Sequence, residues 1–256
     1  MNLNFNTDIV KNYHSGTQIA RVLTENWVQE NLYCPRCGNE RISHFRNNRP
    51  VADFYCPFCK NEFELKSKNG SIQRKVNDGA YETMIQRITG NQNPDFLFMS
   101  YSKEGNCVRD LILVPKHFFV PDVIEARSPL PATARRAGWI GCNILIGKIP
   151  QQGRIDIIKN GILTPSAEVV MRVNKSNLLT VDNLSARGWL MDVLTCVNQI
   201  PSDIFSLSDI YRFVPMLSLK HPQNNNIEAK IRQQLQFLRD KGYIEFLGKG
   251  VYRKIQ

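Results

Sequence analysis

Apolar and polar residues in the first part of the chain follow a helical, then a strand-like, then again a helical spacing. Within residues 1 to about 32 the spacing predicts mainly helix, because apolar residues recur on one helix face: Ile19, Val22, Leu23 and Trp27. From Cys34 to about Lys68, Pro, Gly and Asn interrupt the chain every few residues, which favours short strands and turns. A further helix is predicted over Asp78 to Thr89, where Gly90 ends it.

Two runs of apolar, aromatic and β-branched residues follow, at Asp95 to Tyr101 and Val108 to Val114, on either side of a turn with Asn and Gly. This pattern is typical of a β-hairpin. A shorter hairpin is predicted around Asn160-Gly161, whereas residues 120 to 150 contain several Pro and Gly and favour loops. We therefore expect an α/β (α+β) domain in which helices pack on a sheet.

The pattern changes near residues 175 to 185, where polar, turn-forming residues dominate, and we place a domain boundary there, giving domains 1–182 and 183–256. Three helices are predicted beyond it: Arg187 to Gln199, one that Ser206 begins, and one that Asn225 or Asn226 caps. In the last, Ile227, Ile231, Leu235 and Leu238 form an apolar stripe, and a hairpin with Lys249 at its tip follows. Three helices and a hairpin predict a winged helix-turn-helix domain.

Composition and charge narrow the class of protein. Apolar residues make up 42% and charged residues 22% of the chain, which are globular values. The longest apolar runs are too short to cross a membrane, and the amino terminus lacks the pattern of a secretory signal, so we expect a cytoplasmic protein.

Lys and Arg number 33 against 23 Asp and Glu, a net charge of +10 that favours a polyanion such as nucleic acid, although a solvated basic surface would give the same total. Residues 126 to 155 contain five basic residues and no acidic one, which makes that stretch the candidate phosphate-facing surface: Arg127, Arg135, Arg136, Lys148 and Arg154.

Four of the seven cysteines form two Cys-x-x-Cys pairs, Cys34 with Cys37 and Cys56 with Cys59, separated by eighteen residues. This spacing is typical of two zinc knuckles that close one tetrahedral site. Two pairs of buried thiols, or a redox motif, are the alternatives. Because four protein ligands leave no open position, we expect Zn²⁺ here to be structural, and the chemistry to lie elsewhere.

An acidic residue and an alternating acidic and basic strand flank the second cysteine pair. Asp53 precedes Cys56, and Glu64-Leu65-Lys66 follows Cys59 on a predicted strand, where Glu64 and Lys66 face the same side. Two carboxylates can hold one or two Mg²⁺ ions, and the lysine can orient or deprotonate a water and counter developing charge. A surface strand with alternating charge is the simpler interpretation of this motif alone, and Glu25 is the candidate partner of Lys66.

These residues resemble the PD-(D/E)xK nuclease superfamily, with Asp53, Glu64 and Lys66 at the motif positions and Ala52 in place of the usual proline. More closely, the ordered blocks RPVADFYC, EFELKSK, NDGAY, PATARRAGWIGCN and KIRQQLQ resemble the DpnI-like family of methyl-directed type II restriction endonucleases. The resemblance implies a nuclease domain with a mixed sheet followed by a winged helix. It also implies that both domains bind double-stranded DNA, and that both strands of G-A-T-C are cut only when the adenine is N6-methylated. We expect a monomer.

Reading N6-methyladenine needs an apolar or aromatic contact in addition to polar ones. Trp139 is the candidate, beside the phosphate-binding candidates Arg135 and Arg136, although it is equally well interpreted as a core residue. In the tail, the third helix presents polar residues opposite its apolar stripe and the hairpin adds basic ones, so we expect DNA contacts from Asn226, Lys230, Gln233, Gln236, Lys249 and Arg253. A solvated polar face is the alternative.

Two competing functions remain open at this point. The first is a zinc-containing winged-helix transcription regulator, in which Asp53, Glu64 and Lys66 are ordinary surface charges. The second is a repair nuclease of the same fold that acts without methyl dependence. The first would bind DNA without cutting it, and the second would cut methylated and unmethylated DNA alike.

Overall fold

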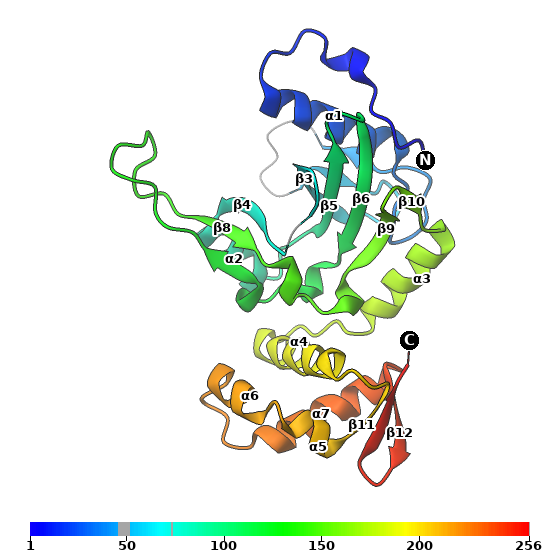
Figure 1. Cartoon of the computed structure of the whole chain (residues 1–256), viewed down its shortest axis with the longest axis vertical. Helices are drawn as coiled ribbons and strands as arrows, with labels where there is room; N and C mark the ends of the chain where they lie inside the picture. The colour runs from blue at the N-terminus through cyan, green and yellow to red at the C-terminus, as the bar shows by residue number, and fades with distance from the viewer. Residues whose placement is uncertain (46–51, 73, 256) are drawn as a thin grey trace. The chain divides into compact units, whose positions relative to one another are not determined.

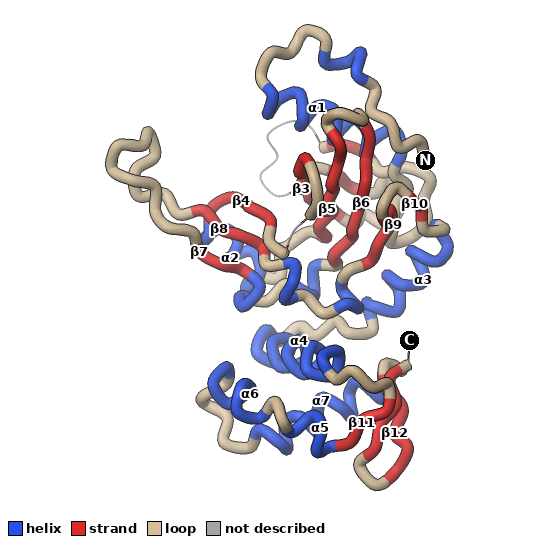
Figure 2. The backbone as a smooth tube through the Cα atoms, in the orientation of Figure 1, coloured by secondary structure: helices blue, strands red, loops and turns tan. Residues whose placement is uncertain are grey.

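The computed structural model describes residues 1–45, 52–72 and 74–255, so the first three residues of the RPVADFYC block lie outside it. The chain divides into two compact units, residues 1–177 and residues 178–256. Figure 2 shows that unit 1 combines strands with flanking helices, whereas unit 2 is mainly helical with a small sheet. Among the described helices, none combines the length and the apolar character that crossing a bilayer requires.

Unit 1 is built around a seven-stranded mixed sheet with the strand order β1-β2-β3-β5-β6-β9-β10. Strands β3 and β5 run parallel, and the other neighbouring pairs run antiparallel. The strands are β1 (Ser43–His44), β2 (Phe54–Tyr55), β3 (Glu62–Asn69), β5 (Asp95–Ser102), β6 (Cys107–Val114), β9 (Ile155–Lys159) and β10 (Ile162–Leu163). This confirms the predicted mixed sheet, including its hairpins at β5–β6 and β9–β10.

Helices flank this sheet, as predicted (Figure 1). The α-helices of unit 1 are α1 (Gly16–Asn31), α2 (Tyr81–Thr89) and α3 (Ser166–Asn177), and its 3₁₀ helices are η1 (Thr7–Val10), η2 (Lys116–Phe118), η3 (Pro121–Val123), η4 (Ile146–Lys148) and η5 (Gln151–Gly153). Helix α1 begins later than the sequence pattern predicts. Residues 3–5, which precede it, run instead beside the start of β6, where Val108 donates its N–H to the carbonyl of Leu3 and Phe5 donates its N–H to that of Asn106. Helix α3 was not predicted.

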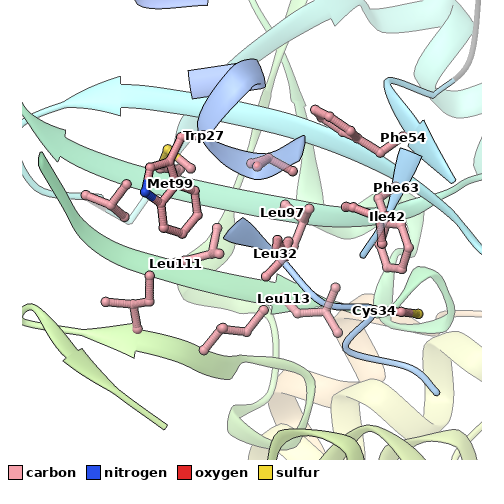
Figure 3. Packing of buried hydrophobic residues seen from close by; sticks show 14 of the residues in the cluster. Trp27, Leu32, Cys34, Ile42, Phe54, Phe63, Leu97, Met99, Leu111 and Leu113 are labelled. Carbon is pink, nitrogen blue, oxygen red and sulfur yellow. The ribbon is translucent and has the colours of Figure 1, made fainter. Parts of the chain in front are cut away.

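The core lies between α1 and one face of the sheet, as Figure 3 shows. Trp27 of α1 and Leu32 just after it pack with Leu97 and Met99 of β5, which is buried on both faces along most of its length. Burial of each such side chain stabilises the fold by roughly 1.5–3 kcal/mol. Thr24 also donates from its Oγ1 to Ser67 Oγ at 3.2 Å, so α1 is fixed directly against β3.

A second, smaller sheet of order β4-β8-β7 is built from β4 (Val76–Ala80), β7 (Ile124–Ala126) and β8 (Gly141–Ile144). The predicted helix start at Asp78 is therefore wrong, because residues 78–80 pair with β8 and helix α2 begins only at Tyr81. The pairing partner lies more than sixty residues away, so local spacing could not indicate it. Between β7 and β8, residues 127–140 form a long projecting loop, here called the arm (Figure 1).

Unit 2 contains α4 (Leu184–Gln199), α5 (Leu207–Tyr211), α6 (Val214–Lys220) and α7 (Ile227–Asp240), with a sheet of order β11-β13-β12. Its strands are β11 (Ile204–Ser206), β12 (Ile244–Gly248) and β13 (Val251–Lys254). Ser206 begins α5 with a reciprocal capping box to Asp209, as its N-cap sequence predicts. All four stripe residues of α7 are buried, which confirms its predicted inner face. Helix α6 and strand β11 were not predicted.

Candidate functional site

The four predicted zinc ligands converge on one point. The Sγ atoms of Cys34, Cys37, Cys56 and Cys59 all lie within 4.8 Å of one another. Cys34 Sγ is 3.7 Å from Cys59 Sγ, and Cys37 Sγ is 3.6 Å from Cys56 Sγ. A tetrahedral zinc with bonds of about 2.3 Å would place its sulfur ligands roughly 3.8 Å apart, so this cluster can hold one zinc ion.

The two knuckles have the same backbone design. Gly38 donates its N–H to the carbonyl of Cys34, and Lys60 donates to that of Cys56, at 2.8 and 3.0 Å. Both residues have a left-handed backbone, with φ of 77° at Gly38 and 62° at Lys60. Glycine adopts this conformation freely, whereas lysine does so at some cost. The chain thus turns sharply twice to bring two thiols of each pair together.

A buried carboxylate fastens both knuckles to the central sheet. Asp95, at the start of β5, is fully buried and accepts hydrogen bonds from Asn61 Nδ2 at 2.8 Å and from the N–H of Lys116 at 2.8 Å. Arg36 Nη1, from the first knuckle, lies 3.4 Å from the same carboxylate. Burial raises the pKa of Asp95, and these donors oppose that effect. Local sequence does not indicate this role, because the three partners come from three separate segments.

The second knuckle is the turn of the β2–β3 hairpin. Phe54 pairs with Phe63 across this hairpin, and Asp53 donates its N–H to the carbonyl of Phe63 at 3.0 Å. Asp53 Oδ2 then accepts the N–H of Leu65 at 2.7 Å. The carboxylate of Asp53 is therefore held beside the strand that bears Glu64 and Lys66, even though ten residues separate Asp53 from Glu64 in the sequence.

Glu64 and Lys66 lie on one side of β3, as predicted, and they form an ion pair with Lys66 Nζ 2.6 Å from Glu64 Oε1. The other oxygen, Glu64 Oε2, is 3.2 Å from Arg87 Nη1 of α2. Lys66 also contacts the carboxylate of Asp78 from β4. The side chains are mostly buried, with exposed fractions of 13% for Glu64, 19% for Lys66 and 5% for Asp78. This burial contradicts the simpler interpretation of an alternating surface strand.

The electrostatics of this cluster favour a charged lysine. Burial alone would lower the pKa of Lys66, but the carboxylates of Glu64 and Asp78 outweigh it and raise that pKa above the usual value. For Glu64, burial raises the pKa, and Lys66 and Arg87 pull it back down. The cluster thus consists of two cations and two carboxylates that compensate one another.

The predicted partner of Lys66 is wrong, and two residues that were not predicted contact the Glu64–Lys66 pair. Glu25 does not contact Lys66; its Oε2 lies 3.4 Å from His44 Nε2. Burial raises the pKa of Glu25, and the nearby charge of Asp53 raises it further. The residues that do contact the Glu64–Lys66 pair are Asp78 and Arg87. Asp78 stands in the NDGAY block, which was the only available signal, and nothing in the sequence singles out Arg87.

Asp53 and Glu64 offer carboxylate oxygens from adjacent strands, which is the donor chemistry that suits Mg²⁺. Their geometry is less convergent than that of the thiols. Within residues 1–45, 52–72 and 74–255, the cysteine cluster is the one group of three or more His, Cys, Asp or Glu side chains whose ligand atoms converge for a metal. The oxygens of Glu64 are held instead by Lys66 and Arg87.

The arm holds the three residues predicted to read DNA in unit 1. Arg135 and Arg136 are exposed, and Trp139 is partly buried rather than part of the core. The guanidinium of Arg136 lies 4.7 Å from the centre of the Trp139 ring. The ring passes directly over Gly141, where a Cβ would come within 2.8 Å of it, so only glycine permits this placement.

In unit 2, the predicted polar face of α7 faces solvent. Asn226, Gln233 and Gln236 are exposed, and Lys230 Nζ donates to Gln233 Oε1 at 2.8 Å. Lys249 stands at the tip of the β12–β13 hairpin with φ of 49°. Arg253 is opposite Glu245 across this hairpin, 3.2 Å away. The positive charge of Arg253 is thereby partly offset.

A mixed sheet that buries an acid–lysine strand, a cysteine cluster suited to zinc, and a second, mainly helical unit are the features expected of a nuclease with a DNA-binding domain. Comparison with known families agrees: a model described as the Dam-replacing family (DpnI) matches residues 1–182, and one described as the Dam-replacing HTH domain matches residues 185–254. The chain belongs to the Dam-replacing family, and it is therefore a site-specific nuclease of the restriction class.

Proposed function

We propose that this protein cleaves double-stranded DNA at G-A-T-C sites whose adenine is N6-methylated, by metal-dependent hydrolysis of the phosphodiester bond. The observation that supports this most is that Asp53 Oδ2 accepts a hydrogen bond from the N–H of Leu65, which places Asp53 beside the strand that bears Glu64 and Lys66. The chain also belongs to a family of restriction nucleases. Metal-dependent phosphodiester cleavage uses hard oxygen ligands for the ion and a nearby cation, and these residues provide that set.

Asp53 and Glu64 would hold Mg²⁺, which when bound stabilises negative charge on the phosphate and lowers the pKa of a bound water. Lys66 lies between the carboxylates of Glu64 and Asp78, which outweigh burial and raise its pKa, and this placement favours a role as an ammonium donor. It orients the attacking water and offsets the charge that develops on the phosphate. Arg87 contributes a second positive charge on the far side of Glu64.

Recognition of the methyl group is assigned to the arm. Trp139 offers an aromatic surface for the methyl group, and Arg135 and Arg136 beside it bind phosphates. In unit 2, Asn226, Gln233 and Gln236 can bond adenine edges, while Lys230, Lys249 and Arg253 contact phosphate. Of these, Arg253 should contribute least, since Glu245 already opposes its charge.

One plasmid, prepared with and without adenine methylation, tests the proposal. With Mg²⁺, the wild-type protein should fragment the methylated form and leave the unmethylated form intact. Lys66→Ala should bind methylated DNA and cut it only at a small residual rate, and Lys103→Ala, an exposed residue of the β5–β6 turn, should cut normally. Wild-type protein that leaves methylated DNA whole would overturn the enzyme proposal. Equal cutting of both forms would instead support a nuclease without methyl dependence.

A further inference from the structure

Lys66 is held between two carboxylates that come from different sheets. Glu64 is its neighbour on β3, whereas Asp78 reaches it from β4 of the smaller sheet. The Asp78 side chain is only 5% exposed, and Lys66 is its ion-pair partner. A carboxylate buried this deeply is stable only if it is paired, so the position of Asp78 and that of Lys66 depend on each other.

The two carboxylates that contact Lys66 differ in their other partners. Glu64 divides its oxygens between Lys66 and Arg87, and in the proposed function it is also a metal ligand. Asp78 is not a proposed ligand. It is therefore the carboxylate that can keep the Lys66 ammonium in place while Glu64 is engaged elsewhere.

Asp78 is also tied by its backbone to the arm. In the β4–β8 pair, Asp78 lies opposite Cys142 and Ala80 opposite Gly141, with a register shift between them. Gly141 is the first residue after the arm, and the Trp139 ring passes directly over it. The neighbouring Tyr81 donates its N–H to the carbonyl of Ile140 at 3.1 Å. The base of the arm is thus joined by backbone pairing to the strand that bears Asp78.

We propose that Asp78 is a positioning residue that holds the ammonium of Lys66 in place for cleavage. Through Asp78, the position of this ammonium depends on how the arm binds DNA. This inference rests on the proposed function, and it adds to it the link between recognition by the arm and the chemistry at β3. Asp78 acts through Lys66 and contacts neither the DNA nor the metal.

The test compares Asp78→Asn, which keeps the shape and removes the charge, with Asp78→Glu, which keeps the charge. Single-turnover cleavage with Mg²⁺, DNA affinity with Ca²⁺ in its place, and the melting temperature are measured for each. Asp78→Asn should cleave methylated DNA about 10- to 100-fold more slowly, with affinity and melting temperature near those of wild type. Asp78→Glu should recover part of that loss. The matched control is Glu82→Gln on the exposed side of α2, which should behave as wild type.

Two further readouts separate positioning from a merely structural role. In a Lys66→Ala background, Asp78→Asn should cause no further loss of rate, because the group that it positions is gone. In Asp78→Asn alone, the ratio of the cleavage rate on methylated DNA to that on unmethylated DNA should fall, because the proposed link acts only when the arm is bound to its site. Wild-type rates for Asp78→Asn, or a loss that adds fully to that of Lys66→Ala, would overturn the positioning role, and an unchanged ratio would overturn the link to the arm. Wild-type protein that cuts no DNA would instead refute the proposed function.

Discussion

The turn and the strands of the β2–β3 hairpin differ in how their ligand-type side chains are arranged. At the turn, the thiols of Cys56 and Cys59 meet those of Cys34 and Cys37, and all four sulfur atoms lie within 4.8 Å of one another. On the strands a few residues away, Asp53 is held by a backbone N–H, and Glu64 by Lys66 and Arg87. The thiols face one another, whereas Asp53 faces a backbone N–H and Glu64 faces two cations of the protein.

This difference agrees with the different roles proposed for the four thiols and for the two carboxylates. A structural ion stabilises the fold best when every ligand is fixed around it and no position is open. A site for hydrolysis needs ligands that leave room for water and phosphate, with charged groups near the places where charge develops. We call the turn the closed part, because its ligands converge on one position, and the strands the open part, because the oxygens of Asp53 and Glu64 do not converge in this way.

The strongest test of the open part is Asp53→Asn. Removing this carboxylate should lower single-turnover cleavage by about 10³-fold, the loss expected for one metal ligand of a hydrolytic site. Bound zinc and melting temperature should not change, because Asp53 is not part of the cysteine cluster. Asp8→Asn, on the exposed amino-terminal segment, is the control. Cleavage within a few fold of wild type would show that the carboxylate pair is not the active site.

The closed part is tested by Cys56→Ser or by strong chelation of zinc. Because the second knuckle is the turn between Asp53 and Glu64, its loss should lower the free energy of unfolding by several kcal/mol and abolish cleavage. Metal analysis, thermal melting and a digest after Mg²⁺ repletion measure the three effects. The control is Cys107→Ser, an isolated thiol that should leave zinc content unchanged. Activity that survives with zinc shown to be absent would contradict this dependence.

The Trp139→Ala variant tests whether recognition of the methyl group is independent of the cysteine cluster and of the carboxylate pair. We expect the preference for methylated DNA to fall about 10- to 100-fold, the value of roughly one good base-edge contact. Zinc content and the cleavage of fully bound DNA should be affected far less. The rates on methylated and unmethylated oligonucleotides give the ratio, and Trp139→Phe should retain most of it. A preference that stays the same would assign recognition to unit 2.

The smallest predicted effect distinguishes the two knuckles by the residue that each has in the left-handed conformation, Gly38 in one and Lys60 in the other. Gly38→Ala should lower the free energy of unfolding by about 1 kcal/mol, since alanine at φ of 77° is strained. A Cβ there would have ample space, with Val170 Cγ2 at 3.8 Å, so the cost is conformational. Lys60→Gly should have the opposite sign, because lysine already bears that strain at φ of 62°. Chemical denaturation of both variants is the measurement, and equal signs would refute the argument.

Much of this molecule follows from local pattern. The two Cys-x-x-Cys pairs predicted the cysteine cluster, because thiols at that spacing can reach one ion from a single turn. Alternation placed Glu64 and Lys66 on one side of a strand, and the stripe of α7 predicted its buried face. Each of these signals is contained in a few neighbouring residues.

The features that the sequence could not provide all depend on partners far apart in the chain. Asp78 was assigned to a helix, and it joins a strand because residues 141–144 pair with it. Arg87 and Asp78 meet the Glu64–Lys66 pair only after β3, α2 and the smaller sheet have packed together. Asp95 holds the two knuckles through contacts with three other segments of the chain.

The sequence by itself thus determined which residues could bind metal and DNA, and that a nuclease-like part precedes a helix-turn-helix part. Only the tertiary structure decided which charges surround Lys66 and how the arm is joined to them. Local spacing constrains the direction of a side chain, because backbone geometry repeats along a helix or strand. The choice of a distant ionic partner depends instead on burial, which becomes defined only once the sheets have assembled.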